Sequence, residues 1–229
     1  MAKRPLFIPL DCTPYVQSMS VEFQWHGGFA RSQRIKCIQG MHQSIKKTGW
    51  PGEILEISSA SEQTFGQQLS AMNLMVSLEH NGTIITQCVE TIYQSAKVFG
   101  NVGPHPEWLT LTGQETKKKV KEVTKSHGAA TAFEWNGRRW SGAAVESFYS
   151  WIYIQGLMQL ENGLQQLSAF SGFTDVYFNP KKTVNCQART AAQTVQLWKL
   201  GLLEDLMESP EAFENFCQKN PSGLVGRIK

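Results

Sequence analysis

Residues 87–99 carry two stripes with helical spacing, and they read Gln87-Cys88-Val89-Glu90-Thr91-Ile92-Tyr93-Gln94-Ser95-Ala96-Lys97-Val98-Phe99. Apolar positions separated by steps of three, four and three form a core face, namely Val89, Ile92, Ala96 and Phe99. Polar positions at i, i+3, i+4 and i+7 form an adjacent face, namely Glu90, Tyr93, Gln94 and Lys97. The pattern predicts one helix over residues 86–99, ended by the glycines and prolines of residues 100–106.

The polar face combines an acid, a phenol, an amide and an amine. On a continuous helix Glu90 and Lys97 would lie two turns apart, about 10 Å. That separation exceeds the i to i+4 spacing of the pairs that stabilise exposed helices. The spacing therefore suits two groups that reach opposite ends of one ligand, although a polar surface stripe has the same pattern.

Outward from this stretch, short strands and longer helices alternate. Strands are predicted at 5–9, 21–25 and 53–58, and hairpins at the turns Asn81-Gly82 and Asn136-Gly137. Helices are predicted at 32–47, 114–125, 144–168 and 184–203, followed by a C-terminal tail, while residues 64–77 fit no single state. We expect a compact α+β fold that is mainly α with small β elements. Residues 1–60 are predicted to form an N-terminal β/α lobe packed on a core of residues 61–229, within one domain or as a semi-separate part.

The composition is that of an ordinary globular protein. The 229 residues include 18% charged residues and carry a formal net charge of +3. Five cysteines without a CxxC pair argue against both a disulfide framework and a zinc site, and they favour a reducing, cytoplasmic location. We expect no metal, no cofactor and no membrane span, since no phosphate-loop, dinucleotide-binding or long apolar segment occurs.

Lysines are concentrated in residues 117–125, at Lys117, Lys118, Lys119, Lys121 and Lys125. Such a run is commonly the solvated face of an exposed helix. The same run is also suited to contacts with the phosphate backbone of a nucleic acid, which would make binding sensitive to salt.

The 89–99 segment resembles the signature helix of the NADAR family, with Glu90, Tyr93, Gln94, Lys97 and Phe99 matching. Thr91 stands where that family usually has His. The weaker matches are the segment containing Asn73, the segment Phe173-Thr174-Asp175, and Asn185 followed by Arg189. The usual glycine-rich loop is replaced by residues 178–182. The resemblance covers residues 65–205, and the whole chain looks most like the branch associated with DarT-type toxin–antitoxin systems.

The resemblance implies an ADP-ribose glycosidase of NADAR-like helical fold that reverses guanine ADP-ribosylation on DNA as an antitoxin. The implied partners are ADP-ribosylated guanine in DNA (or in RNA or a nucleotide) and a cognate ADP-ribosyltransferase toxin. Two other functions stay open. One is N-glycosidic cleavage of ribosylamino-pyrimidine intermediates of the riboflavin pathway, and the other is non-catalytic binding of ADP-ribose or the toxin.

Three residues are the candidate catalytic groups. Glu90 is expected to transfer protons. Lys97 either attacks ribose C1″ as a neutral amine or holds a phosphate as an ammonium. Asp175 either orients the ribose hydroxyls or serves as a second carboxylate, although it could also be a loop cap.

The candidate substrate-binding residues offer amide, phenol and guanidinium groups. They are Asn73, Tyr93, Gln94, Asn185 and Arg189. Arg189 follows Asn185 by one turn and could bind a pyrophosphate through two parallel hydrogen bonds, or form a buried ion pair instead.

Overall fold

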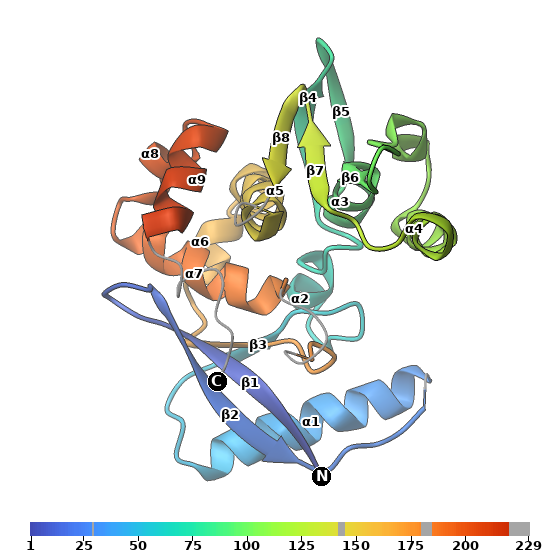
Figure 1. Ribbon diagram of the computed structural model, residues 1–229. Coiled ribbons are helices and arrows are strands. Elements are labelled where there is room, and N and C mark those ends of the chain that lie inside the picture. The colour runs from blue at the N-terminus through green and yellow to red at the C-terminus, as the bar shows by residue number, and fades with distance from the viewer. Residues whose placement is uncertain (29, 142–144, 180–184, 220–229) are drawn as a thin grey trace.

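The computed structural model describes residues 1–28, 30–141, 145–179 and 185–219. Helices outweigh strands, and the strands form three small sheets, so the predicted α+β class is confirmed. Figure 1 shows a lower part built on the N-terminal strands and helix and an upper part built around a central helix. Within the described residues, no helix is long and apolar enough to cross a membrane.

The lower part contains a four-stranded sheet with the strand order β2-β1-β9-β3. Its strands are β1 (Ala2–Pro9), β2 (Val16–Phe23), β9 (Gly172–Thr174) and β3 (Ile54–Glu56). β9 runs antiparallel to β1 and parallel to β3, so the carboxyl ends of β3 and β9 meet at one edge of the sheet. Because β9 comes from the second predicted segment, this sheet joins both segments, and their division into a lobe and a core stays a prediction.

Helix α1 (Arg31–Lys47) covers this sheet with the apolar face that its sequence predicts. Cys37, Ile38, Met41 and Ile45 on the helix are buried against a core that the strands share. Burying such side chains contributes about 1.5–3 kcal/mol each. This packing fixes the edge at which β3 and β9 end.

The upper part surrounds α5 (Val145–Gln159), from which Phe148, Ile152, Tyr153 and Leu157 are fully buried. Around α5 lie the β4–β5 hairpin, the three-stranded sheet β6-β7-β8, and the remaining helices (Figure 1). The strands are β4 (Met75–His80), β5 (Thr83–Cys88), β6 (Lys97–Val98), β7 (Ala132–Trp135) and β8 (Arg138–Ser141). The helices are α2 (Thr64–Gln68), α3 (Val89–Ser95), the 3-10 helix η1 (Pro106–Thr110), α4 (Gly113–His127), α6 (Gly163–Leu167), α7 (Gln187–Lys199), α8 (Leu203–Met207) and α9 (Pro210–Lys219).

The helix predicted over residues 86–99 is wrong at both ends. Residues 83–88 are a strand paired with β4, and only Val89–Ser95 are helical. Ala96 caps the helix, and Lys97 and Val98 pair with Phe133 and Ala132 of β7. Helical spacing continues past Ser95 by coincidence, since Ala96 is buried as the cap of α3 and Phe99 is buried from a β-bridge to Val102. Glu90, Tyr93 and Gln94 therefore share a helix, and Lys97 does not.

Two other helix predictions need correction. The helix predicted over 144–168 is broken, because Asn162 adopts a left-handed backbone conformation (φ 53°) between α5 and α6. The predicted C-terminal tail forms α8 and α9, whose apolar residues Leu203 and Phe213 are buried. The helix predicted over 184–203 appears as α7 with a break before α8, and residues 180–184 and 144 lie outside the described residues.

Candidate active site

Helix α3 presents Glu90 in its first turn, directly after the β5 strand. The backbone N–H of Val89 donates to Leu74 O (2.9 Å), and that of Glu90 donates to Ala71 O (2.8 Å). These bonds satisfy N–H groups that a helix start otherwise leaves without partners. The first turn is also where a negative side chain is stabilised by the helix dipole. Glu90 is therefore fixed in place although it is only 6% exposed.

The Glu90 carboxylate is held through one of its two oxygens. Gln94 Nε2 donates to Oε1 (2.6 Å), and the Lys117 ammonium lies 3.2 Å from the same atom. Within the described part of the chain, no hydrogen bond reaches Oε2. A buried carboxylate needs paired donors to offset the loss of water. Here they gather on one side, which leaves Oε2 able to act on a ligand.

Lys117 comes from α4, which packs closely against α3. Gly113 at the start of α4 allows this approach, because a Cβ atom there would lie 3.1 Å from the Glu90 Cβ. A capping box fixes the same end, in which the Thr112 side chain and the Glu115 side chain exchange hydrogen bonds with backbone N–H groups. Lys117 is thus positioned as part of the site rather than as a freely solvated lysine.

Lys97 extends from the short strand β6 and is partly buried. Its ammonium lies over the Tyr93 ring, 5.0 Å from the ring centroid. Burial lowers the pKa of Lys97 to about 8, with Glu90 opposing the shift and Lys117 adding to it. About one-tenth of such amines are neutral at pH 7. The predicted combination of an acid and an amine is therefore present, with the amine supplied by a strand.

Tyr93 connects Lys97 to the start of α7. Its ring stacks on Phe133 (4.7 Å between centroids) and meets Tyr149 edge-on (5.3 Å). Asn185 Nδ2 donates to the Tyr93 hydroxyl at 2.7 Å. Three of the predicted binding residues, Tyr93, Gln94 and Asn185, are thus brought together beside Glu90 and Lys97.

Asp175 directly follows β9 and faces the same region. Its Oδ1 accepts from the N–H groups of Tyr177 (3.2 Å) and Phe178 (3.1 Å), and its Oδ2 accepts from Gln187 Nε2 (3.1 Å). Burial raises the pKa of Asp175 to about 6, while these hydrogen bonds and Lys117 lower it. The loop-cap role foreseen for Asp175 is present, together with an electrostatic link to the lysine that holds Glu90.

Glu56 is a buried carboxyl group that the sequence patterns did not single out. It ends β3 beside Asp175, is 2% exposed, and accepts hydrogen bonds from Val176 N (3.1 Å) and the Thr174 hydroxyl (2.6 Å). Burial, reinforced by Asp175, raises its pKa to about 8. The Thr174 hydroxyl also lies 2.9 Å from His42 Nε2, and the pKa of His42 is lowered to about 4 by burial and by Lys46.

Gln187 joins three segments around the site. Its Nε2 donates to Asp175 and to Ile57 O (2.7 Å), and its Oε1 accepts from Ala71 N (2.8 Å). The turn after α2 and the loops after β3 and β9 are therefore tied to the start of α7. The sequence signal for Gln187 was only its position two residues after Asn185.

Two predicted binding residues are placed differently. Asn73 is exposed, donates to Gln67 O (2.8 Å), and lines a separate surface pocket with Gln68, Met75 and Gln159. Arg189 is partly buried in the first turn of α7 and acts electrostatically on Cys186. The structure thus gives Arg189 a place near Asn185 and separates Asn73 from Glu90. Part of the replaced glycine-rich loop, residues 180–182, lies outside the described residues.

This arrangement suits acid–base and nucleophilic chemistry. It offers the Glu90 carboxylate with one oxygen open to a ligand, the Lys97 amine with its pKa lowered to about 8, and the Asp175 carboxyl group with its pKa raised to about 6. The described residues contain no group of three or more metal-binding side chains. Lys117 was predicted only as part of a lysine run, and Glu56 and Gln187 were missed, because their roles depend on contacts between distant segments.

Comparison with known proteins adds an independent finding. A family model described as the DarT1-associated NADAR antitoxin matches residues 2–223, nearly the whole chain. A search of curated proteins found no match. The family match confirms the resemblance and extends it to the N-terminal strands.

Proposed function

Since the chain belongs to the DarT1-associated NADAR antitoxin family, we propose that it is an N-glycosidase that releases ADP-ribose from a modified guanine in DNA. This activity would reverse the modification made by the toxin with which the family is associated. The observation that carries the proposal is the buried Glu90 carboxylate with an open Oε2, beside a lysine whose pKa is lowered to about 8.

The bond to be broken joins ribose C1″ to a guanine nitrogen. Its electron pair leaves with the nitrogen, which needs a proton, while the sugar carbon gains positive character. In our proposal Lys97 attacks C1″ as a neutral amine and gives up a proton to Glu90 Oε2. Glu90 passes this proton to the departing guanine. The sugar ring opens to an imine on Lys97, and water hydrolyses the imine to release ADP-ribose and restore the amine.

The surrounding residues have supporting roles in this scheme. Lys117 and Gln94 keep Glu90 oriented by donating to Oε1. Tyr93 and Asn185 shape the side of the site next to Lys97. Asp175 is proposed to orient the ribose hydroxyls, with its loop fixed by Gln187 and Glu56.

Product analysis on a substrate panel tests the proposal. The protein is incubated with an oligonucleotide that carries one ADP-ribosylated guanine, with the corresponding nucleotide, and with a ribosylamino-pyrimidine. We expect free ADP-ribose and unmodified guanine from the first two substrates, detected by mass spectrometry. Cleavage of the pyrimidine alone would contradict the proposal in favour of a metabolic glycosidase. Binding of the modified oligonucleotide without any release would indicate a non-catalytic module.

A further inference from the structure

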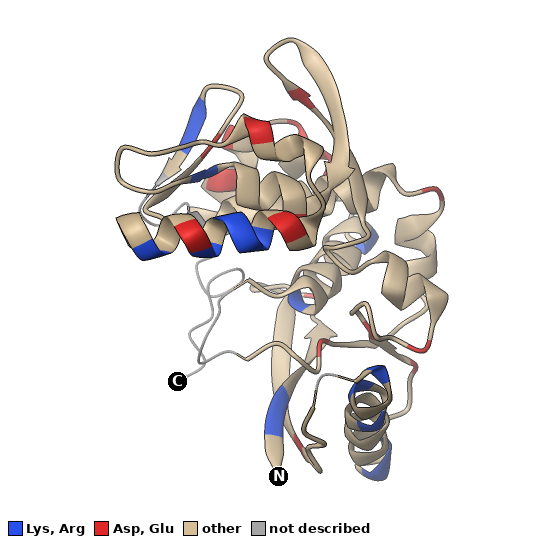
Figure 2. Cartoon of the chain, turned by 90° about the vertical axis from the view of Figure 1, so that its right-hand side faces the viewer, with Lys and Arg blue, Asp and Glu red and all other residues tan. Residues whose placement is uncertain are grey.

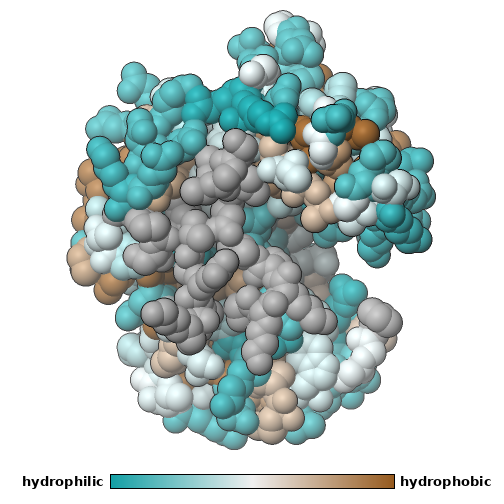
Figure 3. Space-filling model, in the orientation of Figure 1, coloured by the Kyte–Doolittle hydropathy of each residue, from teal (hydrophilic) through white to brown (hydrophobic). Residues whose placement is uncertain are grey.

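A hollow lies between the upper and lower parts of the molecule, next to the candidate active site. In the space-filling view it opens at the right-hand edge, below α4 and above the beginning of α1 (Figures 1 and 3). Viewed from that side, α4 lies across the molecule above the N-terminal strands (Figure 2). The upper and lower walls of this hollow carry different chemistry.

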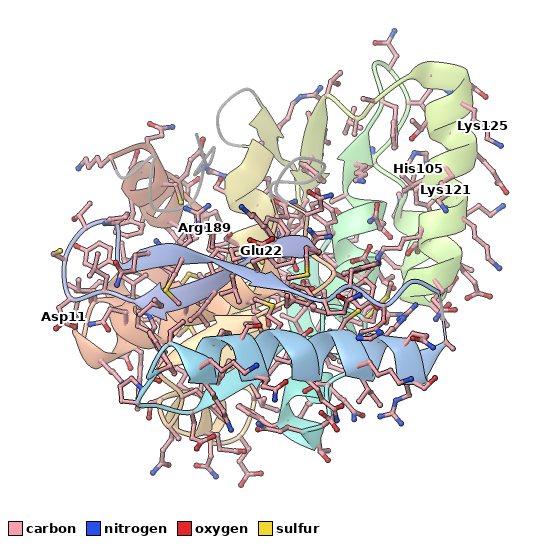
Figure 4. All side chains as sticks on the ribbon, turned by 90° about the horizontal axis from the view of Figure 1, so that it is seen from below. Asp11, Glu22, His105, Lys121, Lys125 and Arg189 are labelled. Atoms are coloured by element: carbon pink, nitrogen blue, oxygen red, sulfur yellow. The ribbon has the colours of Figure 1, made fainter. Side chains whose placement is uncertain are left out.

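The upper wall is the basic flank of α4. Lys117 shows which flank faces the site, because its ammonium contacts Glu90. Lys121 and Lys125 follow Lys117 at steps of four residues, so they continue along the same flank. Seen from below the N-terminal strands, both lie along α4 beyond the beginning of α1 (Figure 4). Successive steps of four residues advance about 6 Å, which is close to the spacing of phosphates in an extended nucleic-acid strand.

The opposite flank of α4 has a different charge character. Lys119 pairs there with Glu122 (3.5 Å), and Glu115 closes the capping box. Within the described residues, neither Lys121 nor Lys125 forms a salt bridge, although Glu122 lies three residues before Lys125. If the lysines served only to keep the protein soluble, we would expect them to be distributed equally over both flanks of α4.

The lower wall is a row in which arginines and aromatic rings alternate. Arg4 lies over the Trp25 ring (5.2 Å), Trp25 meets Tyr177 (5.4 Å between centroids), and Arg34 lies over the Tyr177 ring (5.3 Å). Arg4 also donates to Val176 O at 3.1 Å. Tyr177 remains 36% exposed although it is held from two sides. Aromatic rings and guanidinium planes of this kind are surfaces on which unpaired bases stack.

The position of the row next to the site is fixed by the chain itself. Tyr177 lies two residues after Asp175, and its N–H donates to the Asp175 carboxylate. Arg31 and Arg34 lie in the first turn of α1, which contains no acidic residue. Positive charge at the start of a helix is opposed by the helix dipole. An anionic ligand in the hollow would relieve this repulsion.

We propose that the hollow binds a single-stranded nucleic acid on either side of the modified base, with the α4 lysines at its phosphates and Tyr177 under a neighbouring base. The inference rests on the proposed function, because it takes the Glu90 site as the place of the modified guanine. Duplex DNA keeps its bases stacked on one another, so Tyr177 selects an unpaired strand.

Fluorescence anisotropy with an unmodified, labelled strand of roughly ten nucleotides tests this surface directly. We expect affinity to fall with salt. In the double variant Lys121→Gln/Lys125→Gln, the slope of log K against log[salt] should decrease in magnitude by about 1.4, since each phosphate contact contributes about 0.7. Lys119→Gln is the control on the opposite flank; it removes one positive charge where the double variant removes two, and it should leave the slope unchanged. Equal slopes for the two variants would overturn the proposal.

The row of arginines and aromatic rings on the lower wall is tested by Tyr177→Ala and Tyr177→Phe. Loss of a stacked base weakens binding roughly tenfold, so the alanine variant should bind more weakly at every salt concentration and the phenylalanine variant should not. A duplex of the same sequence should bind less tightly than the strand. Wild-type affinity of Tyr177→Ala, or equal affinity for strand and duplex, contradicts the proposal.

Hydrolysis of the modified mononucleotide separates this inference from the proposed function. The Lys121→Gln/Lys125→Gln protein should cleave the mononucleotide with wild-type kcat/KM and lose efficiency only on the oligonucleotide. If the wild-type protein cleaves the mononucleotide but does not bind the strand, the inference fails and the proposed function stands. If it binds the strand as expected but cleaves neither substrate, the proposed function fails.

Discussion

At the residue scale, Glu90 and Lys97 are prepared for chemistry by what surrounds them. Glu90 has both of its donors on Oε1, which leaves Oε2 for a ligand. Lys97 is neutral more often than an exposed lysine, because burial lowers its pKa to about 8. Lys117 contacts Glu90 and shifts the pKa of both Lys97 and Asp175, so it couples the three charged groups.

The pH dependence of the reaction follows from the state of Lys97. A neutral amine attacks, and its fraction rises about tenfold between pH 7 and pH 9 for a pKa of about 8. The value of kcat/KM should therefore rise over this range and then level off. Measurement of kcat/KM against pH checks this, with the folded state monitored by circular dichroism at each pH.

Lys97→Arg is the control for that profile, because arginine keeps the charge and does not deprotonate. We expect this variant to be inactive across the range, and borohydride to trap a sugar adduct on Lys97 in the wild-type protein alone. An active Lys97→Arg protein, or a rate that declines above pH 8, would show that the lysine acts as a phosphate-binding cation.

At the scale of elements, the parallel ends of β3 and β9 bring two carboxyl groups together. Glu56 ends β3, and its Cα pairs with that of Thr174 immediately before Asp175. Glu56 accepts from Val176 N and from the Thr174 hydroxyl, so its carboxyl group orders the loop that carries Asp175. The cost of this arrangement is a buried acid whose pKa is raised to about 8.

This buried acid makes stability depend on pH in a defined window. Between pH 6.5 and pH 8 the folded state binds a proton at Glu56 that the unfolded state, with its ordinary pKa near 4.5, does not bind. Stability therefore falls as pH rises, by up to about 1.4 kcal/mol per pH unit. His42 opposes this fall near pH 6.5, where unfolded His is still partly protonated while folded His42, with its pKa lowered to about 4, is neutral. Lys97 opposes it near pH 8, because its pKa is lowered to about 8 in the folded state. Over most of the window the contribution of Glu56 is the larger one.

Urea unfolding at several pH values checks this expectation with Glu56→Gln. Glutamine has the shape of the protonated acid and keeps the hydrogen bond from Val176. The variant should therefore be about as stable as the wild type near pH 6.5 and more stable at pH 8.5. A wild-type profile that is flat across the window, or one that Glu56→Gln leaves unchanged, would contradict the assignment.

At the scale of the whole molecule, local sequence patterns predicted helices and strands but did not predict which of them contact one another. The α+β class, α1, α4 and the β7–β8 hairpin follow from periodicity and turn residues. The helix over 86–99 was overextended, because Ala96 at the helix cap and Phe99 at a β-bridge are buried at positions that also fit helical spacing. The break at Asn162 was missed, although Asn162-Gly163 repeats the Asn-Gly signal of the two hairpin turns and Asn162 adopts the same left-handed backbone as Asn81 and Asn136.

In the candidate site, too, the sequence predicted individual residues but not the contacts between distant segments. Glu90, Lys97, Tyr93, Gln94, Asn185 and Asp175 were found from the sequence, mostly through the family resemblance. Lys117 was seen only as one lysine of a run, and Glu56 only as a residue inside the strand predicted at 53–58. Their roles arise from α4 packing on α3 and from β3 pairing with β9, contacts that link residues far apart in the chain.

The central claim is that Glu90 transfers the proton that lets ADP-ribose leave guanine. Its most direct test is the single-turnover rate of ADP-ribose release from an oligonucleotide with one modified guanine, measured for the wild type and for Glu90→Gln. Glutamine keeps the size of the side chain and an oxygen for Gln94, but it does not exchange protons. The account predicts rapid release by the wild type and a loss of roughly 10²–10⁴-fold in the folded variant. Release by Glu90→Gln at the wild-type rate would contradict it.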